Sequence, residues 1–318
     1  MKRAAMIVLP LTAAMLTACG SDSDSGSNST SNTSMSMTDA AVDNATSLML
    51  TVESIELKGE SGTTTEIDVT DDEGNPLQFD LLALQGSESI DLFTDMELET
   101  GEYQWMRLYI DESSSYLITD DGAQHSITIP SNAQTGLKVN TPFTLTDSEE
   151  EFVIDFDVAK SLTLANGEYK LRPTLRLLDV TLVGHISGTV APELLTSCES
   201  PVVYAFEGES ATFEDINIDA DAGPVTSSLV AYNETTADYE YELGFLESGS
   251  YTTYLVCDSD DPEVSGDVEA ASEASSAISV SVGESVELNL SLELSLSTDD
   301  STEETDTTEE TDTTENAA

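Results

Sequence analysis

Short runs of alternating apolar and polar residues fill the chain from residue 47 to residue 182, a pattern typical of β-strands that bury one face. Glycine, asparagine, aspartate or proline separates the runs, and no stretch carries the apolar stripe of an amphipathic helix. The predicted strands of this part are 47–57, 64–69, 77–84, 102–111, 115–119, 124–129, 137–146, 151–158 and 169–182.

The first predicted strand changes phase in its middle. Leu50 and Val52 share one parity, whereas Ile55 and Leu57 share the other. One extra residue is needed to keep both pairs on the buried face, so we expect a β-bulge near Glu53. Turn-forming residues further predict hairpins at 71–75, 120–122 and 166–167.

A second group of alternating runs begins near Gly184. Its predicted strands are 186–190, 201–206, 229–233, 239–246 and 251–257, followed by a closing hairpin over 277–294 around Gly283. The predicted fold is all-β, with two consecutive antiparallel β-sandwich domains flanked by disordered acidic or polar tails. The expected division is a leader at 1–18, a tether at 19–37, sandwiches at 38–182 and 183–297, and a tail at 298–318.

Acidic residues dominate the composition. The 318 residues include 63 Asp and Glu against 9 Lys and Arg, a formal net charge of −54 at pH 7. Such a surface repels phosphate backbones, which excludes sequence-independent nucleic-acid binding. The segment 19–37 and the tail, where a Glu-Glu-Thr-Asp-Thr-Thr hexad repeats, offer little to bury and are expected to be solvated coils.

The chain begins with a basic tripeptide and an apolar run over residues 4–16, which ends in Leu16-Thr17-Ala18-Cys19. This ending resembles the lipobox of bacterial lipoproteins. The resemblance implies cleavage before Cys19 and a lipid on its sulfur, which would be the membrane anchor. Gly20 follows the cysteine, which favours the outer membrane of a Gram-negative bacterium, with the protein facing the periplasm or the cell exterior. An ordinary secretory signal or a short membrane helix is the alternative.

Several segments of the first half resemble the bacterial family known as domain of unknown function 4382. The opening Thr38-Asp39-Ala40 is followed by Ala41, where the family often has proline. The other matching segments are 48–58, 79–84, 100–108, 155–161 and 171–177. The resemblance covers about 38–180 and implies a β-sandwich without an established activity.

The second half resembles a carboxypeptidase-regulatory or transthyretin-like sandwich. The likeness rests on a first strand that contains Gly188-Thr189-Val190 and on Gly249-Ser250-Tyr251, which leads into a later strand. The usual Asp-Gly-x-Phe turn is replaced by residues 238–241, which lack the glycine. Domains of this kind are usually spacers or adhesion modules.

Three cysteines are present, and lipid occupies Cys19 in this interpretation. Cys198 and Cys257 remain, both in the second sandwich of an exported protein, so we predict a disulfide between them. Two free thiols or part of a metal site are the alternatives.

Candidate catalytic chemistry is scarce. His125 and His185 are the two histidines, and neither belongs to a recognisable nucleophile, metal or phosphate-binding motif. We therefore expect a protein that is not an enzyme and has no cofactor, with both histidines structural or exposed.

Calcium is an alternative ligand, since it favours several oxygen atoms at short spacing. Acidic and amide side chains gather at Asn217, Asp219 and Asp221 and again at Asp258, Asp260, Asp261 and Glu263. The first group departs from an EF-hand loop, and solvated acidic loops are the competing interpretation.

Three of the few cations follow one another near the end of the first sandwich. Lys170, Arg172 and Arg176 share a strand face, and Asp155 and Asp157 share a face of the strand 151–158. Pairing these strands through a hairpin predicts a ladder of opposite charges that stabilises the sheet modestly. The alternative is an anion-receptive patch for an acidic sugar.

These observations predict a lipid-anchored envelope protein that acts as a binding, adhesion or structural module. Its expected partners are the membrane, through the lipid, and an envelope protein or glycan. A calcium- or glycan-binding surface protein is the runner-up, followed by a hydrolase with an unfamiliar site.

Overall fold

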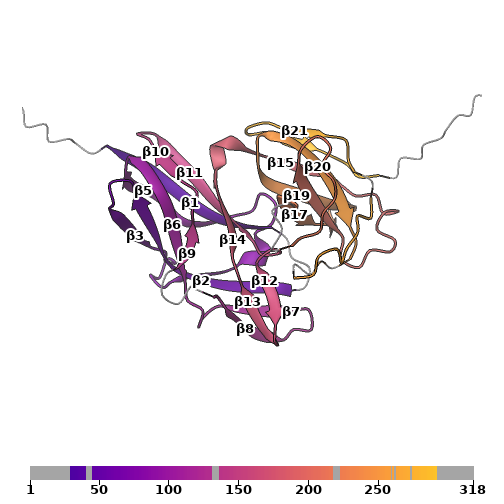
Figure 1. Cartoon of the computed structure of the whole chain (residues 1–318), viewed down its shortest axis with the longest axis horizontal. Coiled ribbons are helices and arrows are strands. Elements are labelled where there is room, and N and C mark those ends of the chain that lie inside the picture. Colours follow the sequence, from indigo (N-terminus) through magenta and orange to yellow (C-terminus); the bar gives the residue numbers. More distant parts are fainter. Residues whose placement is uncertain are drawn as a thin grey trace, which may run out of the picture.

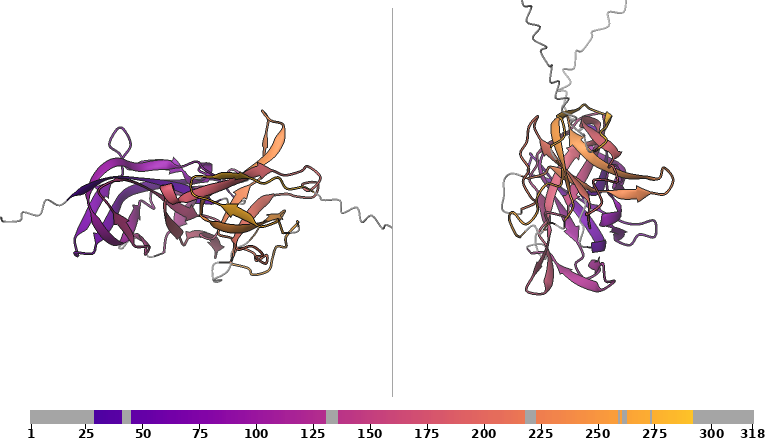
Figure 2. Two further views of the ribbon diagram at one scale, coloured as in Figure 1. Left: turned by 90° about the horizontal axis from the view of Figure 1, so that it is seen from above. Right: turned by 90° about the vertical axis from the view of Figure 1, so that its right-hand side faces the viewer.

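The structure is a computed structural model that describes residues 29–40, 45–130, 136–217, 223–258, 260, 263–272 and 274–291. These residues form strands, turns and two short 3-10 helices, without an α-helix. Two β-sandwich units lie side by side along the long axis of the molecule, the first indigo to magenta and the second orange to yellow (Figure 1, Figure 2). The prediction of an all-β sandwich architecture is confirmed.

The described residues of the first unit form fourteen strands and the 3-10 helix η1. Their bounds are β1 (Thr30–Ala40), β2 (Ala45–Gly59), β3 (Thr64–Asp68), β4 (Leu77–Asp80), η1 (Leu81–Ala83), β5 (Ile90–Glu99), β6 (Gly101–Ile110), β7 (Tyr116–Thr119), β8 (Gln124–Thr128), β9 (Leu137–Val139), β10 (Phe143–Leu145), β11 (Glu149–Asp157), β12 (Leu162–Ala165), β13 (Glu168–Leu171) and β14 (Thr174–Asp179). One sheet has the order β14-β11-β1-β5. The other follows β10-β6-β2-β7-β8-β13-β12, with β3 and β4 paired to β2 and β9 paired to β6. Leu50, Met106 and Phe156 lie fully buried in the core that the two sheets share.

The second unit follows the 3-10 helix η2 (Val180–Leu182) and is built from two four-stranded sheets. Its strands are β15 (Val183–Thr189), β16 (Val202–Glu207), β17 (Thr226–Leu229), β18 (Ala231–Asn233), β19 (Asp238–Glu247), β20 (Gly249–Val256), β21 (Ile278–Val280) and β22 (Ser285–Glu287). The sheet orders are β18-β19-β15-β22 and β17-β16-β20-β21.

Residues 30–37, which we expected to belong to a disordered tether, instead lie in β1, an inner strand of the sheet β14-β11-β1-β5. β1 pairs in parallel with β11 and antiparallel with β5, so both of its edges are hydrogen-bonded. Met35 and Met37 lie in the core, while Ser31 Oγ donates to Ser148 O at 2.9 Å. Two neighbouring ladders and alternate methionines therefore stabilise a strand whose composition is mostly polar. Residues 1–28 and 292–318, which include the predicted leader and tail, lie outside the described residues.

Three predicted strands are shorter than expected. The segment 77–84 ends as a strand at Asp80, whose side chain caps η1. The segment 137–146 splits into β9 and β10, and 169–182 splits into β13, β14 and η2. Pro173 lies between β13 and β14, where its missing N–H interrupts the ladder. Besides β1, strands β5 and β12 were not predicted at all. The predicted strand 229–233 is divided between β17 and β18, which belong to different sheets.

The expected closing hairpin over 277–294 is also wrong. β21 pairs with β20 in one sheet, whereas β22 pairs in parallel with β15 in the other. The turn at Gly283, with φ of 68°, therefore carries the chain from one sheet to the other.

The predicted bulge and turns are confirmed. The register between β2 and β6 shifts between Val52 and Ser54, so Glu53 is the extra residue. The turn at 120–122 joins β7 and β8, as predicted. The turn at 166–167 is also present, but it joins β12 and β13 rather than the two strands 151–158 and 169–177 that we expected it to pair, since β11 pairs with β14. At 71–75, Asp71 N donates to Asn75 O at 2.8 Å.

Strands β16 and β20 are buried on both faces, which explains the continuous apolar run of β16, whereas β20 also buries Thr252 and Thr253. Val203, Ala205 and Leu255 face the core between the two sheets. The opposite faces form an outer cluster with residues of two long loops. The outer cluster contains Ala159, Val202, Tyr204, Phe206, Ile216, Tyr254, Val256 and Val268.

Apolar side chains from both units meet at the junction. Val153 and Leu178 of the first unit pack with Val183 and Phe245 of the second. Phe245 reaches this cluster because the register between β15 and β19 shifts beside it and its φ is 49°, in the left-handed region. The second unit therefore covers the sheet β14-β11-β1-β5 of the first unit, on the face that points away from the core of that unit.

Two glycines bring the backbones of the units together. A Cβ added at Gly244 would lie 1.8 Å from the carbonyl oxygen of Gly86, which has φ of 67°. Beside this contact, Ser87 Oγ and Ser87 N donate to Glu242 Oε2 at 3.0 and 3.3 Å. The loop after η1 is thereby fixed against the outer face of β19.

Candidate functional site

The predicted charge ladder contains one pair in register. Asp155 lies opposite Arg176, whose Nε donates to Asp155 Oδ2 at 2.9 Å and whose Nη2 forms an ion pair with the same oxygen. Lys170 of β13 lies opposite Thr163 of β12, and Arg172 is exposed just after β13. Both cations therefore belong to a different part of the unit from the Asp155 pair.

The two aspartates of this strand face are buried. Asp155 is 3% exposed and Asp157 is 5% exposed, because the second unit covers them. Burial raises the pKa of Asp155, while Arg176 opposes that shift. Lys160 Nζ lies 3.0 Å from Asp157 Oδ2 and donates at 2.5 Å to the carbonyl of Pro224 in the second unit. These charges act as junction contacts.

Other cations gather around the single tryptophan on the outer face of the ten-stranded sheet. The Arg107 guanidinium lies 4.3 Å from the Trp105 ring centroid, and the Lys138 ammonium lies 5.1 Å from it. Arg107 also forms an ion pair of 3.4 Å with Glu56. Each contact is a modest stabilising interaction.

A polar groove of about 710 Å³ runs between the units, and residues of both line it. Its lining residues are Gln85, Gly86, Ser187, Gly188, Thr189, Ser228, Leu229, Glu240, Tyr241, Glu242, Ser285, Glu287 and Asn289. Most of them lie on the outer face of the sheet β18-β19-β15-β22. No lysine or arginine occurs among these described residues, so the groove is an acidic, acceptor-rich surface.

Hydrogen bonds hold the groove side chains in place. Asn289 Oδ1 accepts from Thr189 N at 2.8 Å and Thr189 Oγ1 at 2.9 Å, and Asn289 Nδ2 donates to Glu287 Oε1 at 2.7 Å. The hydrogen bonds of Glu240 to Asn233 and Thr236 lower its pKa, so it remains a charged acceptor. Burial raises the pKa of Tyr241, whose hydroxyl donates to Leu288 O at 2.8 Å. The groove is therefore largely preorganised.

A second cavity of about 420 Å³ at the junction contains His185. The ring of His185 meets Phe245 edge-on at 5.4 Å, and its Nδ1 accepts from Phe245 N at 3.4 Å. The carboxylates in this cavity, Asp91 and Glu151, are exposed. His185 thus has a structural contact that fixes the bulge of β19.

The other histidine lies in the first unit. The His125 ring is 4.9 Å from the ring of Tyr169, and its Nε2 is 3.3 Å from Thr119 Oγ1. These contacts tie β8 to its neighbouring strands β13 and β7.

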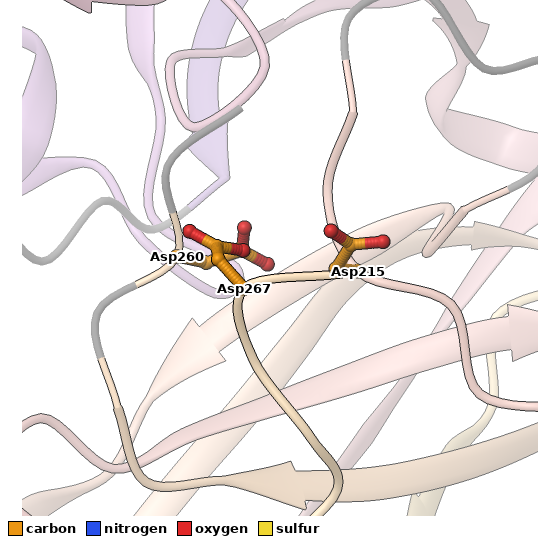
Figure 3. Close-up of side chains that lie close together, drawn as sticks. All are labelled: Asp215, Asp260 and Asp267. Carbon is orange, nitrogen blue, oxygen red and sulfur yellow. The ribbon is translucent and has the colours of Figure 1, made fainter. Parts of the chain in front are cut away.

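Three carboxylates converge at the edge of the outer cluster (Figure 3). Asp215, Asp260 and Asp267 each offer one oxygen, and these oxygens lie within 4.8 Å of one another. Asp215 comes from the segment between β16 and β17, and the other two come from the segment between β20 and β21. Of the predicted calcium candidates, Asp260 belongs to this cluster and Asp258 is exposed beside it. Asp219, Asp221 and Asp261 lie outside the described residues.

Asp260 is held firmly by one of its two carboxylate oxygens. Tyr204 Oη donates to Oδ2 at 2.8 Å, and Ile216 N donates to the same atom at 2.9 Å. Oδ1 is buried without a hydrogen-bond partner. Burial, together with Asp267 and Asp215, raises the pKa of Asp260 to about 6, against the lowering effect of its two donors. Gly266 N donates at 2.5 Å to Asp215, which links the two segments.

The predicted disulfide forms between Cys198 and Cys257, whose Cα atoms are 4.4 Å apart. It joins the entry to β16 and the exit from β20. Cys19, the predicted lipidation site, lies outside the described residues. The described part of the chain contains no helix long and apolar enough to cross a membrane.

Comparison with solved structures yields low similarity. A leucine-rich repeat protein from Bacteroides thetaiotaomicron matches with a TM-score of 0.23 and 9% identity over 84% of this chain and 26% of its own. This chain thus spans about a quarter of that protein. A protein from Bacteroides ovatus, described as a candidate adhesin, matches with a TM-score of 0.21 and 10% identity over 87% of this chain and 99% of its own. At these scores, neither likeness supports a conclusion about function.

No curated protein matches this sequence. A family model does match the first unit, in agreement with the segments of the sequence that resemble it. Residues 30–173, somewhat less than half of the chain, match the family described as Domain of unknown function (DUF4382), and the match begins at the first residue of β1. The first unit is thus similar to this family from β1 through β13.

Proposed function

We propose that this protein is a non-enzymatic, lipid-anchored envelope protein that binds a neutral glycan in the groove between its two units. The groove carries this proposal, because it is shared by both units and lined by ordered polar groups. Sites for small ligands commonly form where two domains meet and contain a few fixed polar groups.

The chemistry of the groove favours a ligand that donates hydrogen bonds and carries no negative charge. Glu240, Glu242 and Glu287 are acceptors when ionised, and Asn289 adds an amide. Sugar hydroxyl groups donate to such acceptors, whereas an acidic sugar would be repelled by the carboxylates. This choice also sets aside the alternative of an anion-receptive patch, since Arg176 is engaged with Asp155.

The anchor and location belong to the same proposal and rest on the sequence. A lipid on Cys19 would hold the protein at the outer membrane, facing the periplasm or the exterior. The second unit would act as a carboxypeptidase-regulatory-like spacer and adhesion module, in keeping with its two four-stranded sheets. Replacing Cys19 by alanine should abolish palmitate labelling and move the protein out of the membrane fraction.

A bulky residue in the groove tests the binding site directly. Ser285 is an exposed groove residue, and Ser285→Trp should reduce binding to a panel of neutral oligosaccharides at least tenfold by filling space. Ser279→Trp, an exposed position on β21, is the matched control and should bind like the wild type. Equal binding by both variants would exclude the groove, and binding of the wild type to acidic glycans alone would exclude the ligand class.

A further inference from the structure

We infer that Asp215, Asp260 and Asp267 form a calcium site that ties two loops of the second unit together. This site is separate from the proposed glycan groove and from the lipid anchor. It lies over the outer cluster, on the opposite side of the sheet β17-β16-β20-β21 from the core of the second unit.

The spacing of the three carboxylates suits one shared ion. Calcium binds oxygens at about 2.3–2.6 Å, so two of its ligands are separated by at most about 5 Å. The oxygens of the three aspartates lie within 4.8 Å of one another. One ion between them would therefore reach all three without a large movement, and water would complete its shell of about six to eight oxygens.

A second observation, independent of this clustering, points to a missing ligand. Asp260 is 8% exposed, and its Oδ1 is buried without a hydrogen-bond partner. An unpaired oxygen on a buried carboxylate is costly, and Asp215 and Asp267 add further negative charge beside it. A cation supplies the interaction that Oδ1 lacks and also neutralises the repulsion among the three charges.

Local structure fixes the principal ligand before any ion arrives. Tyr204 and Ile216 hold Oδ2 of Asp260 at 2.8 and 2.9 Å, so the carboxyl orientation is set by β16 and by the loop that follows it. Gly266 N already links the second loop to Asp215. The site therefore needs little rearrangement. Calcium is favoured over magnesium because it tolerates irregular geometry and gives up bound water more readily.

The acidic composition makes unspecific cation binding a serious background, so the test must be local. Terbium replaces calcium and emits when a nearby tyrosine is excited, and the hydroxyl of Tyr204 lies within hydrogen-bonding distance of a proposed ligand. Titration of the full mature protein with terbium in 150 mM NaCl should give saturable emission that calcium reverses. Tyr204→Phe should lose most of the emission, together with part of the calcium-dependent thermal stabilisation, because Tyr204 also orients Asp260.

Variants that each remove one charge separate the site from the background. Asp260→Asn should weaken terbium binding at least tenfold and abolish the rise in melting temperature with calcium. Because Asp260 is buried, Asp267→Asn at an exposed ligand provides the same test with less risk to folding. Asp258→Asn, exposed and adjacent, is the control and should behave like the wild type. Wild-type affinity in both ligand variants, or an equal loss in the control, would overturn the proposal.

Discussion

A single methyl group at Gly244 should separate the two units. Its Cβ would lie 1.8 Å from Gly86 O and 2.4 Å from Gly86 C, both backbone atoms of the other unit. Real contacts are not this short, and a backbone cannot turn aside as a flexible side chain does. Gly244→Ala therefore requires the loop after η1 to move off β19.

The expected cost follows from what that movement breaks. Overpacking of this kind costs about 1–3 kcal/mol. The hydrogen bonds from Ser87 to Glu242 would also be lost, at about 0.5–1.5 kcal/mol each in a favourable setting and less here because they are exposed. The free energy of unfolding should fall by about 2–4 kcal/mol, which lowers the melting temperature by about 5–10 °C in a domain of this size.

Gly249→Ala in β20, the next strand along the chain, is the matched control. Its Cβ would have no atom nearer than 3.6 Å, and its φ lies outside the left-handed region. This change should be neutral or stabilise by about 0.4–1 kcal/mol through the unfolded chain. Calorimetry gives the melting temperatures, and small-angle scattering shows whether the units separate. Melting of Gly244→Ala within about 1 °C of the control, with unchanged scattering, would refute this account of the junction.

Other perturbations probe buried groups. Arg176→Gln leaves the carboxylate of Asp155 buried without its cation and should lower the free energy of unfolding by about 3–5 kcal/mol in chemical denaturation. Arg172→Gln, at an exposed position, should change this free energy by less than about 0.5 kcal/mol, and equal effects of the two variants would contradict the pairing. The pKa of Asp39 is raised by burial, so the stability that this carboxyl contributes in its protonated form is lost as the pH rises above about 3.8 towards the raised value. Asp39→Asn should match the wild type at pH 3.5 and exceed it at pH 7, and parallel stability curves of the two proteins would disprove the burial effect. Reduction of the Cys198–Cys257 disulfide, whose cysteines are 59 residues apart, should lower the free energy of unfolding by up to about 4 kcal/mol. Equal melting temperatures of the reduced and the oxidised protein would rule this out.

Local rules predicted those features that depend on neighbouring residues. The parity change between Val52 and Ile55 required an extra residue, and the structure has the bulge at Glu53. The same rules missed β1, because strings of serine, threonine and asparagine do not indicate a strand. Its methionines become informative only when β11 and β5 are seen on either side.

The pattern of apolar and polar residues could not predict contacts between distant segments of the chain. Asp155 and Arg176 were paired correctly by alternation, but the cover provided by the second unit was not visible. Likewise, Asp260 is one acidic residue among many in the sequence. Asp215 lies 45 residues earlier in the chain, and no motif connects the two. Tertiary packing of two loops over the outer cluster brings them together.

The position of β1 has a mechanical consequence under the proposed anchoring through the N-terminal segment. A pull on that segment acts along β1, and the ladders with β11 and β5 run across the direction of the force. Their hydrogen bonds would have to break together in shear rather than one after another, as in the peeling of an edge strand. The ladder with β11 extends from Asn32 to Ala40, so the load is shared along nearly the whole strand. The first unit should therefore transmit traction between an anchor and a bound ligand without unravelling from its own end.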